Sequence, residues 1–373
     1  MLELSRFGIE EGRLNWEALL STFKEVKSLK KIPQDTIHHG EGNVLIHTQM
    51  MCEALLKLEE FKSLGLEDKK IVFFAAFFHD LGKGITTKEE GGRIVSPKHA
   101  LKGEVLVREL IYKKWGKAFN FKERETICKL IRYHGLPLFF WNKPQPEKYI
   151  IEASQMVKLS DLVLIAEADC RGRVCGDLDK LLDAIELFKN TAKEQECLNK
   201  PKAFSNGLSR FEYFNKKERA LEYTAYEKEN FKVMLLSGLP AAGKDTWIKT
   251  HGEGLEVITL DEIRTSLKIA PTDEQGKVAQ YAKEQAKAYL REKKSFIWNA
   301  TNTTKEMRAR LVKLFMSYEA NVEIIYIETP YEVLLKRSGK RERNVPRKVI
   351  DKLLKNLEIP SPIEAPKVSY YIE

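Results

Sequence analysis

The sequence predicts two domains, an all-α domain followed by an α/β domain with a parallel sheet. The chain has 373 residues, which is more than one hydrophobic core usually organises. Apolar residues recur at helical spacing up to about residue 198, and apolar strands alternate with helices after residue 230. The composition, 43% hydrophobic and 31% charged, is that of a globular protein rather than a disordered one.

The first region, residues 1–198, is expected to be mostly helical, with Gly- and Pro-bearing loops between its helices. The segments with the clearest helical spacing are Val44–Glu60, Lys69–His79, Lys102–Lys114 and Arg124–Tyr133. Residues 199–229 are polar and charged, so we predict a linker there, with a short helix near Lys216–Tyr226.

The second region, residues 230–373, alternates between strands and helices. The predicted strands are Phe231–Ser237, Glu256–Leu260, Ser295–Asn299 and Val322–Glu328, and the predicted helices are Gln275–Glu292 and Lys305–Tyr318. Apolar strands that alternate with helices favour a parallel sheet covered on both faces.

Charge and hydropathy narrow the classes of function. The net charge of +9 raises the local concentration of polyanions such as nucleic acid, but a solvated Lys-rich surface has the same composition, so charge alone does not decide between these two interpretations. The longest apolar run, Ile71–Phe78, is too short to span a bilayer, and the start lacks the layout of a signal peptide. We therefore expect a cytoplasmic protein without a membrane partner, and its five cysteines are expected to be reduced.

The first strand of the second region runs directly into Gly238-Leu-Pro-Ala-Ala-Gly243-Lys244-Asp245-Thr246. A strand, a turn bounded by glycines and a Gly-Lys pair opening a helix are typical of a loop that binds the phosphates of a nucleotide. Backbone N–H groups and the helix N-terminus attract the phosphates, and Lys244 would reach the β- and γ-phosphates. The residues predicted to bind ATP or another NTP with Mg²⁺ are Gly238, Ala242, Gly243, Lys244, Asp245 and Thr246.

Asp245 stands where a Ser or Thr hydroxyl usually meets Mg²⁺. A carboxylate can also hold Mg²⁺, directly or through water, so we expect a changed ligand geometry rather than a lost site.

A second carboxylate, Asp261, follows the strand Glu256–Leu260. Because the carboxyl ends of parallel strands face the phosphate site, Asp261 could accept the proton of an attacking hydroxyl. Arg264, three residues later on the same helical face, could bind a phosphate with two hydrogen bonds. The alternative is an N-cap aspartate beside a surface arginine.

Basic residues then gather between Tyr331 and Arg347. They are Lys336, Arg337, Lys340, Arg341, Arg343 and Arg347. Small P-loop kinases need a movable basic lid to neutralise the transferring phosphoryl group, although charge runs are usually only solvated faces. The position of this stretch, after the strand Val322–Glu328, favours the lid.

The segment from Phe231 to about Leu354 resembles the 5′-hydroxyl polynucleotide kinases. The resemblance depends on G-x-P-x-x-G-K followed by Thr-Trp, on Asp-x-x-Arg and on the Arg-rich stretch ending in Val-Pro. It implies phosphoryl transfer from an NTP to the 5′-OH of RNA or DNA, with Asp261 as the base and Arg264 on the 3′-phosphate of the acceptor. It also implies lid contacts by Arg337 and by Arg341, with Arg343 as the alternative to Arg341. The polar residues implied near the acceptor are Asn299, Thr301 and Asn302.

Histidines and aspartates recur through the first region. The series consists of His47, His79, Asp80, His99, His134 and Asp169. Imidazoles and carboxylates from different helices can hold Mn, Co, Ni, Zn or Fe with open positions for phosphate and water. Such a site would hydrolyse phosphoesters, whereas each histidine alone is more often a core or surface residue.

Roughly residues 35–180 resemble the HD superfamily, and within it the HD domain of bacterial CCA-adding tRNA nucleotidyltransferases. The motifs are His39-Gly-Glu, His47-Thr, His79-Asp-Leu-Gly-Lys and Glu167-Ala-Asp-x-Arg-Gly-Arg. The resemblance implies that the metal ligands are His47, His79, Asp80 and Asp169. It places His99 and His134 on a second metal or the phosphate, and Lys83 on the phosphate. Asp161 competes with Asp169 for the last ligand position, and the residues flanking Asp169 favour Asp169.

Together the two regions resemble the HD-Pnk family of bacterial RNA end-healing enzymes. This resemblance implies that one chain phosphorylates 5′-OH ends and hydrolyses 2′,3′-cyclic phosphate or 2′/3′-phosphate ends, with RNA, or DNA, as partner and a ligase acting downstream. The alternatives are a small-molecule nucleoside kinase fused to a nucleotidase, and a nucleic-acid-binding module without catalysis.

Overall fold

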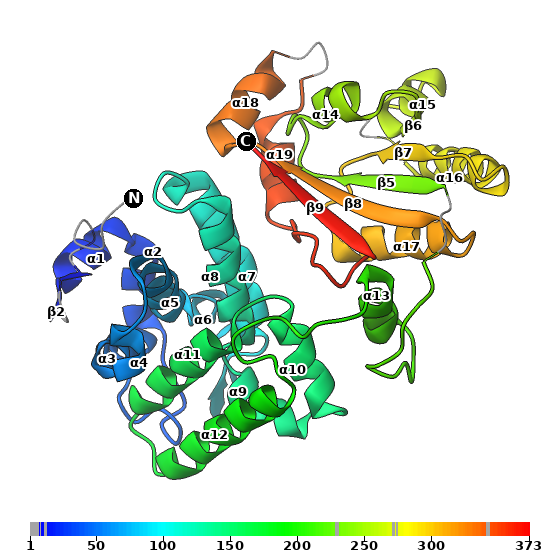
Figure 1. Ribbon diagram of the computed structural model, residues 1–373. Coiled ribbons are helices and arrows are strands. Elements are labelled where there is room, and N and C mark those ends of the chain that lie inside the picture. Colours follow the sequence, from blue (N-terminus) through cyan, green and yellow to red (C-terminus); the bar gives the residue numbers. More distant parts are fainter. Residues whose placement is uncertain are drawn as a thin grey trace. The chain divides into compact units, whose positions relative to one another are not determined.

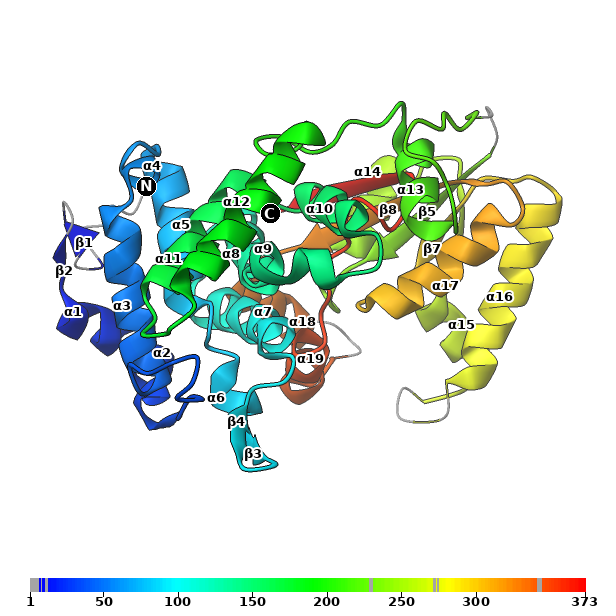
Figure 2. The same cartoon turned by 90° about the horizontal axis from the view of Figure 1, so that it is seen from below.

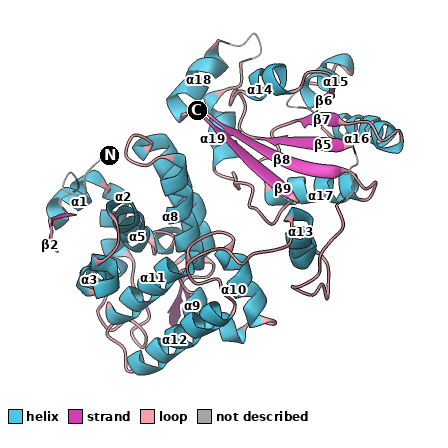
Figure 3. Ribbon diagram, in the orientation of Figure 1, coloured by secondary structure: helices cyan, strands magenta, loops and turns pink. Residues whose placement is uncertain are grey.

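The computed structural model describes residues 7, 9–10, 13–227, 231–270, 273, 275–340 and 344–373. They form two compact units, Met1–Lys202 and Ala203–Glu373. The first unit is nearly all helix and the second contains the large sheet, which confirms the predicted fold class (Figure 3).

Helix α5 (Leu66–Phe78) is the centre of the first unit. Every side chain from Ile71 to Phe78 is buried, because α3, α8 and α11 all pack around this helix. The Phe23 ring and the Trp115 ring pack against the phenylalanines of α5. The helix ends at His79, so the core directly positions the histidine and aspartate that follow.

The remaining helices of the unit surround this core. They are α1 (Trp16–Thr22), α2 (Lys24–Lys27), α3 (Val44–Lys57), α4 (Glu59–Lys62), α6 (Lys83–Thr86), α7 (His99–Leu110), α8 (Phe121–Tyr133), α9 (Leu136–Phe139), α10 (Pro146–Ser154), α11 (Leu159–Arg171) and α12 (Leu178–Glu194). Short 3₁₀ turns lie at Ser28–Lys31 and Phe140–Asn142, and a π-helical turn lies at Ile111–Trp115. Two short hairpins, Ile9–Glu10 with Arg13–Leu14 and Lys88–Glu90 with Arg93–Val95, were not predicted.

Two predicted segments differ in detail from the observed helices. The segment Val44–Glu60 is two helices rather than one, because Leu58 is extended between α3 and α4. The helix expected near Lys216–Tyr226 is wrong. The helix of this region, α13 (Gly207–Asn215), lies earlier, because the Asn206 side chain caps it by accepting a hydrogen bond from the Ser209 N–H.

The second unit contains a five-stranded parallel sheet of order β6-β7-β5-β8-β9. Its strands are β5 (Lys232–Ser237), β6 (Glu256–Thr259), β7 (Phe296–Asn299), β8 (Asn321–Glu328) and β9 (Lys367–Ile372). Its helices are α13, α14 (Lys244–His251), α15 (Leu260–Ser266), α16 (Gly276–Arg291), α17 (Lys305–Met316), α18 (Tyr331–Gly339) and α19 (Arg347–Leu354). The edge strand β9 was not among the predicted strands.

Alternation along the strands decides which helices cover each face. Val233 and Leu235 of β5 pack in one cluster with side chains of α16 and α17. Helix α14 lies on the other side of the sheet from α17, as Figure 1 shows. Because all five strands are parallel, their carboxyl ends meet along one edge, where the phosphate loop follows β5.

Candidate active sites

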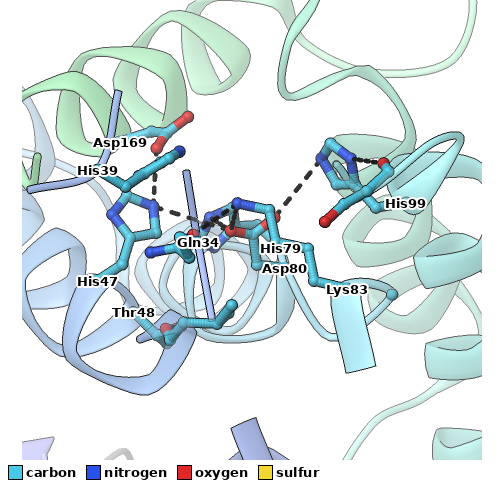
Figure 4. Close-up of polar contacts among 12 residues, drawn as sticks. Gln34, His39, His47, Thr48, His79, Asp80, Lys83, His99 and Asp169 are labelled. Atoms are coloured by element: carbon cyan, nitrogen blue, oxygen red, sulfur yellow. Dashed lines mark hydrogen bonds and ion pairs between the residues drawn. The ribbon is translucent and has the colours of Figure 1, made fainter. Parts of the chain in front are cut away.

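Three helices bring the predicted metal ligands of the first unit together (Figure 4). His47 on α3 has its Nε2 atom 3.0 Å from Asp169 Oδ1 on α11 and 3.9 Å from Asp80 Oδ2. The Nε2 atom of His79, at the end of α5, lies 3.1 Å from Asp80 Oδ2. All four side chains are buried, so the fold itself assembles the cluster.

The hydrogen bonds of the imidazoles leave the Nε2 atoms facing the cluster. The Nδ1 atom of His79 lies 2.8 Å from the Ala76 carbonyl oxygen. Because a carbonyl can only accept, this Nδ1 carries the proton and Nε2 keeps its lone pair. In the described part of the chain, His47 Nε2, His79 Nε2 and both Asp80 oxygens are buried and form no hydrogen bond of good geometry. Their nearest polar neighbours are one another, the Asp169 carboxylate and the Lys83 ammonium. A divalent cation would satisfy these atoms, so the residues fit a metal.

His99 and His134 form a second pair of facing imidazoles. Each donates its Nδ1–H to a backbone carbonyl, at 3.0 Å and 2.8 Å, and their Nε2 atoms lie 3.3 Å apart. Burial, and then the neighbouring His99 and His79, lower the pKa of His134 to about 3, so its ring is neutral at pH 7. The two Nε2 atoms face each other closely enough for both rings to ligate one cation.

Lys83 adds a positive charge next to the cluster. Its Nζ atom lies 2.7 Å from Asp80 Oδ2 and donates to Gln34 Oε1 at 2.8 Å. Burial opposes ionisation of Asp80, but His79 and Lys83 outweigh it and hold the pKa of this carboxyl well below its usual range. A buried ammonium with one carboxylate partner is placed to bind a phosphate.

The structure gives different surroundings to Asp161 and Asp169, the two candidates for the last ligand position. Asp169 lies in the cluster, where Arg173 and His47 lower the pKa of its carboxyl against the effect of burial. Asp161 lies two turns earlier on α11, and its Oδ1 atom is 3.7 Å from Lys158 Nζ. Burial raises the pKa of Asp161 to about 6. The geometry therefore favours Asp169 as the ligand.

Two further charged residues support the cluster and were not assigned a role from the sequence. Glu41 Oε1 lies 2.9 Å from His39 Nδ1 and 3.0 Å from His47 Nδ1, and its other oxygen accepts a hydrogen bond from the Val174 N–H. Arg173 donates to Asp169. Both residues stand in the quoted motifs, so the signal was present, but only the fold shows which atoms they orient.

Two glycines allow the helices to approach closely enough. A Cβ atom on Gly82 would lie 2.1 Å from the His99 carbonyl oxygen, and one on Gly172 would lie 2.5 Å from Met51 Cα. Any larger residue would push α7 away from Asp80, or α3 away from the end of α11. The cluster borders a cavity of about 680 Å³, which is also lined by His39 and Lys83.

In the second unit, Gly238-Leu-Pro-Ala-Ala-Gly243-Lys244 forms a tight loop between β5 and α14. Gly238 and Gly243 have φ values of 151° and 104°, which side chains rarely adopt. Lys244 donates to the carbonyls of Gly238 and Leu239, at 3.0 Å and 2.9 Å. Helix α14 begins at Lys244, so its N-terminus faces the loop, as phosphate binding requires.

The polar residues at the end of β7 mainly hold this loop. Asn299 donates to Asp245 Oδ1 at 2.9 Å, and the Thr301 carbonyl accepts a hydrogen bond from the Gly238 N–H. Asn302 is buried and donates its amide to the Leu236 carbonyl at 2.7 Å. The acceptor contacts of Asn299, Thr301 and Asn302 stay predictions, and the structure gives these residues contacts that support the loop. Ala242 is buried in the loop, and Thr246 is exposed in the first turn of α14.

Asp261 lies in the first turn of α15, directly after β6, and 75% of its side chain is exposed. Arg264 NH1 donates to Asp261 Oδ1, and Arg264 Nε donates to Gln275 Oε1 at 2.8 Å. The carboxylate and the guanidinium thus lie side by side at the edge of the sheet that carries the phosphate loop.

The predicted lid begins with α18. Arg337 on this helix donates to both carboxylate oxygens of Glu373, at 2.6 Å and 2.8 Å. Its NH1 atom would lie 3.9 Å from a Cβ on Gly243, so this arginine is next to the phosphate loop. Arg341 and Arg343 lie outside the described residues.

Comparisons with known proteins match the two regions of the chain separately. Residues 43–164 match the HD domain family, and residues 233–360 match the AAA domain family. The first region is 30% identical over 176 residues to a multifunctional CCA protein of Shewanella frigidimarina, and 37% identical over 169 residues to that of Hahella chejuensis. These matches cover 42% of this chain and 36% and 35% of the relatives, so the chain spans about a third of their length. A sugar kinase structure from a Janibacter species matches with a TM-score of 0.30 and 21% identity, over 38% of this chain and 85% of that protein.

The chain therefore combines an HD phosphohydrolase-type domain with a P-loop kinase-like domain. The first implies a divalent metal and the second a nucleotide with Mg²⁺. In the part of the chain that the structure describes, no helix has the length and hydropathy to cross a membrane.

Proposed function

We propose that the chain repairs broken nucleic-acid ends, phosphorylating a 5′-OH with an NTP and hydrolysing a 2′,3′-cyclic phosphate or a 2′/3′-phosphate. The main support is the presence in one chain of a phosphate loop with an adjacent Asp261–Arg264 pair and a metal-fitting cluster with Lys83. Breakage of RNA by transesterification yields a 2′,3′-cyclic phosphate, which is a substrate for the first unit, and a 5′-OH, which is a substrate for the second. The net charge of +9 agrees with a polyanionic partner.

In the phosphohydrolase, His47, His79, Asp80 and Asp169 would hold the metal, which we expect to be Mn, Co, Ni or Zn. When bound, the metal polarises a phosphoryl oxygen and lowers the pKa of water. Lys83 neutralises charge on the phosphate from the side of Asp80. His99 and His134 would bind a second ion through the lone pairs of their Nε2 atoms, or the phosphate where an Nε2 atom carries a proton that it can donate.

In the kinase, Lys244 exchanges its bonds to the loop carbonyls for the β- and γ-phosphates. Asp261 accepts the proton of the 5′-hydroxyl, and Arg264 holds the 3′-phosphate of the same nucleotide. Arg337, next to Gly243, neutralises the charge that develops on the transferring group. The loop residues, with Asp245 and Thr246, hold the NTP and Mg²⁺.

One incubation tests both activities. The chain is mixed with ATP, Mg²⁺, Mn²⁺ and an oligoribonucleotide that carries a 5′-OH and a 2′,3′-cyclic phosphate, and both ends are followed. We expect a 5′-phosphate and a 2′- or 3′-phosphate or free hydroxyl to appear. Phosphorylation of nucleosides in preference to the oligonucleotide would instead support a small-molecule kinase fused to a nucleotidase. A matched oligodeoxyribonucleotide shows the preference between RNA and DNA, and addition of an RNA ligase shows whether the healed ends can be joined.

A further inference from the structure

The segment after His134 leaves an aromatic side chain exposed at the cavity of the first unit. Leu138 and Phe140 are buried, and the Phe140 ring packs edge-on against Phe188 of α12, with centroids 5.4 Å apart. These two anchors fix the short helix α9 and the turn that follows it. Phe139, between them, lines the cavity, and 53% of its surface is exposed.

A second aromatic ring reaches the same cavity from α10. Ile150 and Ile151 are buried and anchor this helix, while Tyr149 before them lines the cavity and is 37% exposed. Helices α9 and α10 both pack against α12 (Figure 2). The exposed rings that these two helices carry line one cavity. Exposed aromatic side chains that border a cavity are typical of binding sites rather than of a solvated surface.

Positive charges accompany these rings. Lys143 Nζ lies 5.9 Å from the centroid of the Tyr149 ring, and both residues line the cavity with Arg132. The cavity is not uniformly basic, because carboxylates also line it, namely Asp35, Asp80, Glu152, Asp169 and Asp177. Two of them already have cationic partners, since Asp80 pairs with Lys83 and Asp169 with Arg173. Aromatic rings next to Lys and Arg are the combination that binds single-stranded nucleotides, because bases stack while cations pair with phosphates.

We infer that Phe139 and Tyr149 form a nucleobase subsite, which holds the terminal base of a nucleic-acid strand while its phosphate lies at Asp80 and Lys83. This subsite rests on the proposed phosphohydrolase function and defines its substrate as a nucleotide end rather than any phosphoester. A cavity of about 680 Å³ is in the range that encloses small ligands, roughly 300–1,000 Å³. Stacking is tolerant of sequence, so all four bases bind.

Selectivity between two phosphoesters tests the subsite. The substrates are a 5′-phosphorylated trinucleotide with a 3′-phosphate and glycerol 2-phosphate, which has no ring to stack. We expect the ratio of their kcat/KM values to fall on the order of tenfold in Phe139→Ala and in Tyr149→Ala, through KM of the trinucleotide. Phe139→Trp should restore the ratio, and Leu187→Ala, which removes an exposed side chain outside the cavity lining, should not change it.

A binding measurement separates failure of the subsite from failure of the proposed function. The dissociation constant of a fluorescent trinucleotide 3′-phosphate is measured by anisotropy in the Lys244→Ala background, which weakens binding at the phosphate loop. If the wild type hydrolyses neither ester, the proposed function is wrong, and an unchanged dissociation constant in Phe139→Ala then rejects the subsite as well. If both esters are hydrolysed and the ratio stays the same in both alanine variants, only the subsite is wrong.

Discussion

The cluster around Asp80 and the loop around Lys244 differ in how deeply their charged groups are buried and in how well these groups are hydrogen-bonded. In the first unit, within the described residues, His47 Nε2, His79 Nε2 and the Asp80 oxygens are buried and form no hydrogen bond of good geometry, although Asp80 Oδ2 lies 2.7 Å from the Lys83 ammonium. In the second unit, Lys244 already donates to two carbonyls of its own loop, and Asp261 is largely exposed beside Arg264. The core assembles the first site, and its polar atoms would gain good partners only from a ligand. In the second site, Lys244 keeps its hydrogen bonds to the loop until a nucleotide displaces them.

The difference has an energetic consequence. A buried polar atom without a good hydrogen bond costs up to about 1–3 kcal/mol, so a metal that binds only the folded state should stabilise the first unit. Exposed groups that already have partners gain less free energy of stabilisation when a ligand replaces those partners. The predictions below test whether the two sites really differ in this way, beginning with the largest effect.

Asp80→Ala should abolish phosphoester hydrolysis, by at least on the order of a thousandfold, because it removes a carboxylate that faces His47, His79, Lys83 and His99 at once. Bound metal, measured by elemental analysis, should fall with it. Kinase activity should stay near normal, since the sites lie in separate units. Unchanged metal content with retained hydrolysis would show that the buried cluster is only structural.

Lys244→Ala should abolish the other activity instead and lower 5′ phosphorylation on the order of 10²–10³-fold, because it removes the ammonium expected to contact the β- and γ-phosphates. Lys249→Ala is the matched control, as this exposed lysine lies in the last turn of the same helix. Asp261→Ala should also remove phosphorylation. Equal loss of both activities in a folded Lys244→Ala protein would contradict the independence of the two units.

Asp80 and Lys244 were identified from the sequence because each stands in a short local motif. The Gly-Lys loop and the His-Asp pair are contiguous, and their chemistry follows from residue type and spacing. The strands β5 to β8 were predicted within a residue or two, since apolar runs between helices are strong signals. The partial exposure of β9 breaks this pattern, which is why it was not predicted.

The resemblance to the HD superfamily placed His47, His79, Asp80 and Asp169 at one site, but the contacts that orient these residues could not be predicted. Glu41 approaches His47 only because the loop before α3 packs against Val174, more than a hundred residues away. Similarly, spacing could not decide between Asp161 and Asp169, because both are buried on α11 and only the packing of α3 selects the second.

Arg264 should select acceptors that carry a 3′-phosphate. Only 20% of its side chain is exposed, and its bonds to Asp261 and Gln275 fix the guanidinium beside the base. Replacement by Ala should cost on the order of 2–4 kcal/mol in kcat/KM for a nucleoside 3′-monophosphate, and Lys should restore only part of it. If the wild type phosphorylates a nucleoside and its 3′-monophosphate equally well, the polynucleotide specificity is wrong and a small-molecule kinase is favoured.

Glu41→Gln should weaken metal binding on the order of 10–100-fold, because Glu41 orients the ring of His47 through Nδ1. Metal affinity is measured by titrating the stripped protein with Mn²⁺ or Zn²⁺, and kinase activity serves as the internal reference. Glu60→Gln, an exposed position in α4, is the control for a lost carboxylate. An unchanged affinity would mean that the cluster holds its metal without the support of Glu41.

Asp161→Asn should leave both activities and the metal content unchanged while increasing stability at neutral pH. Burial raises the pKa of Asp161 to about 6 in the folded state, from 3.8. A carboxyl with a raised folded pKa is penalised once it ionises, so the wild type loses stability as the pH rises from about 4 through 6. At 1.36 kcal/mol per pKa unit this loss is at most about 3 kcal/mol, and the amide does not suffer it. Urea unfolding of both proteins at pH 4 and pH 7.5 should therefore show a difference near zero at the lower pH and up to that amount at the higher. Loss of metal and of hydrolysis in Asp161→Asn would instead make Asp161 the ligand. It would also remove the contrast between Asp169, which the cluster keeps ionised, and Asp161, whose neutral form is favoured by burial.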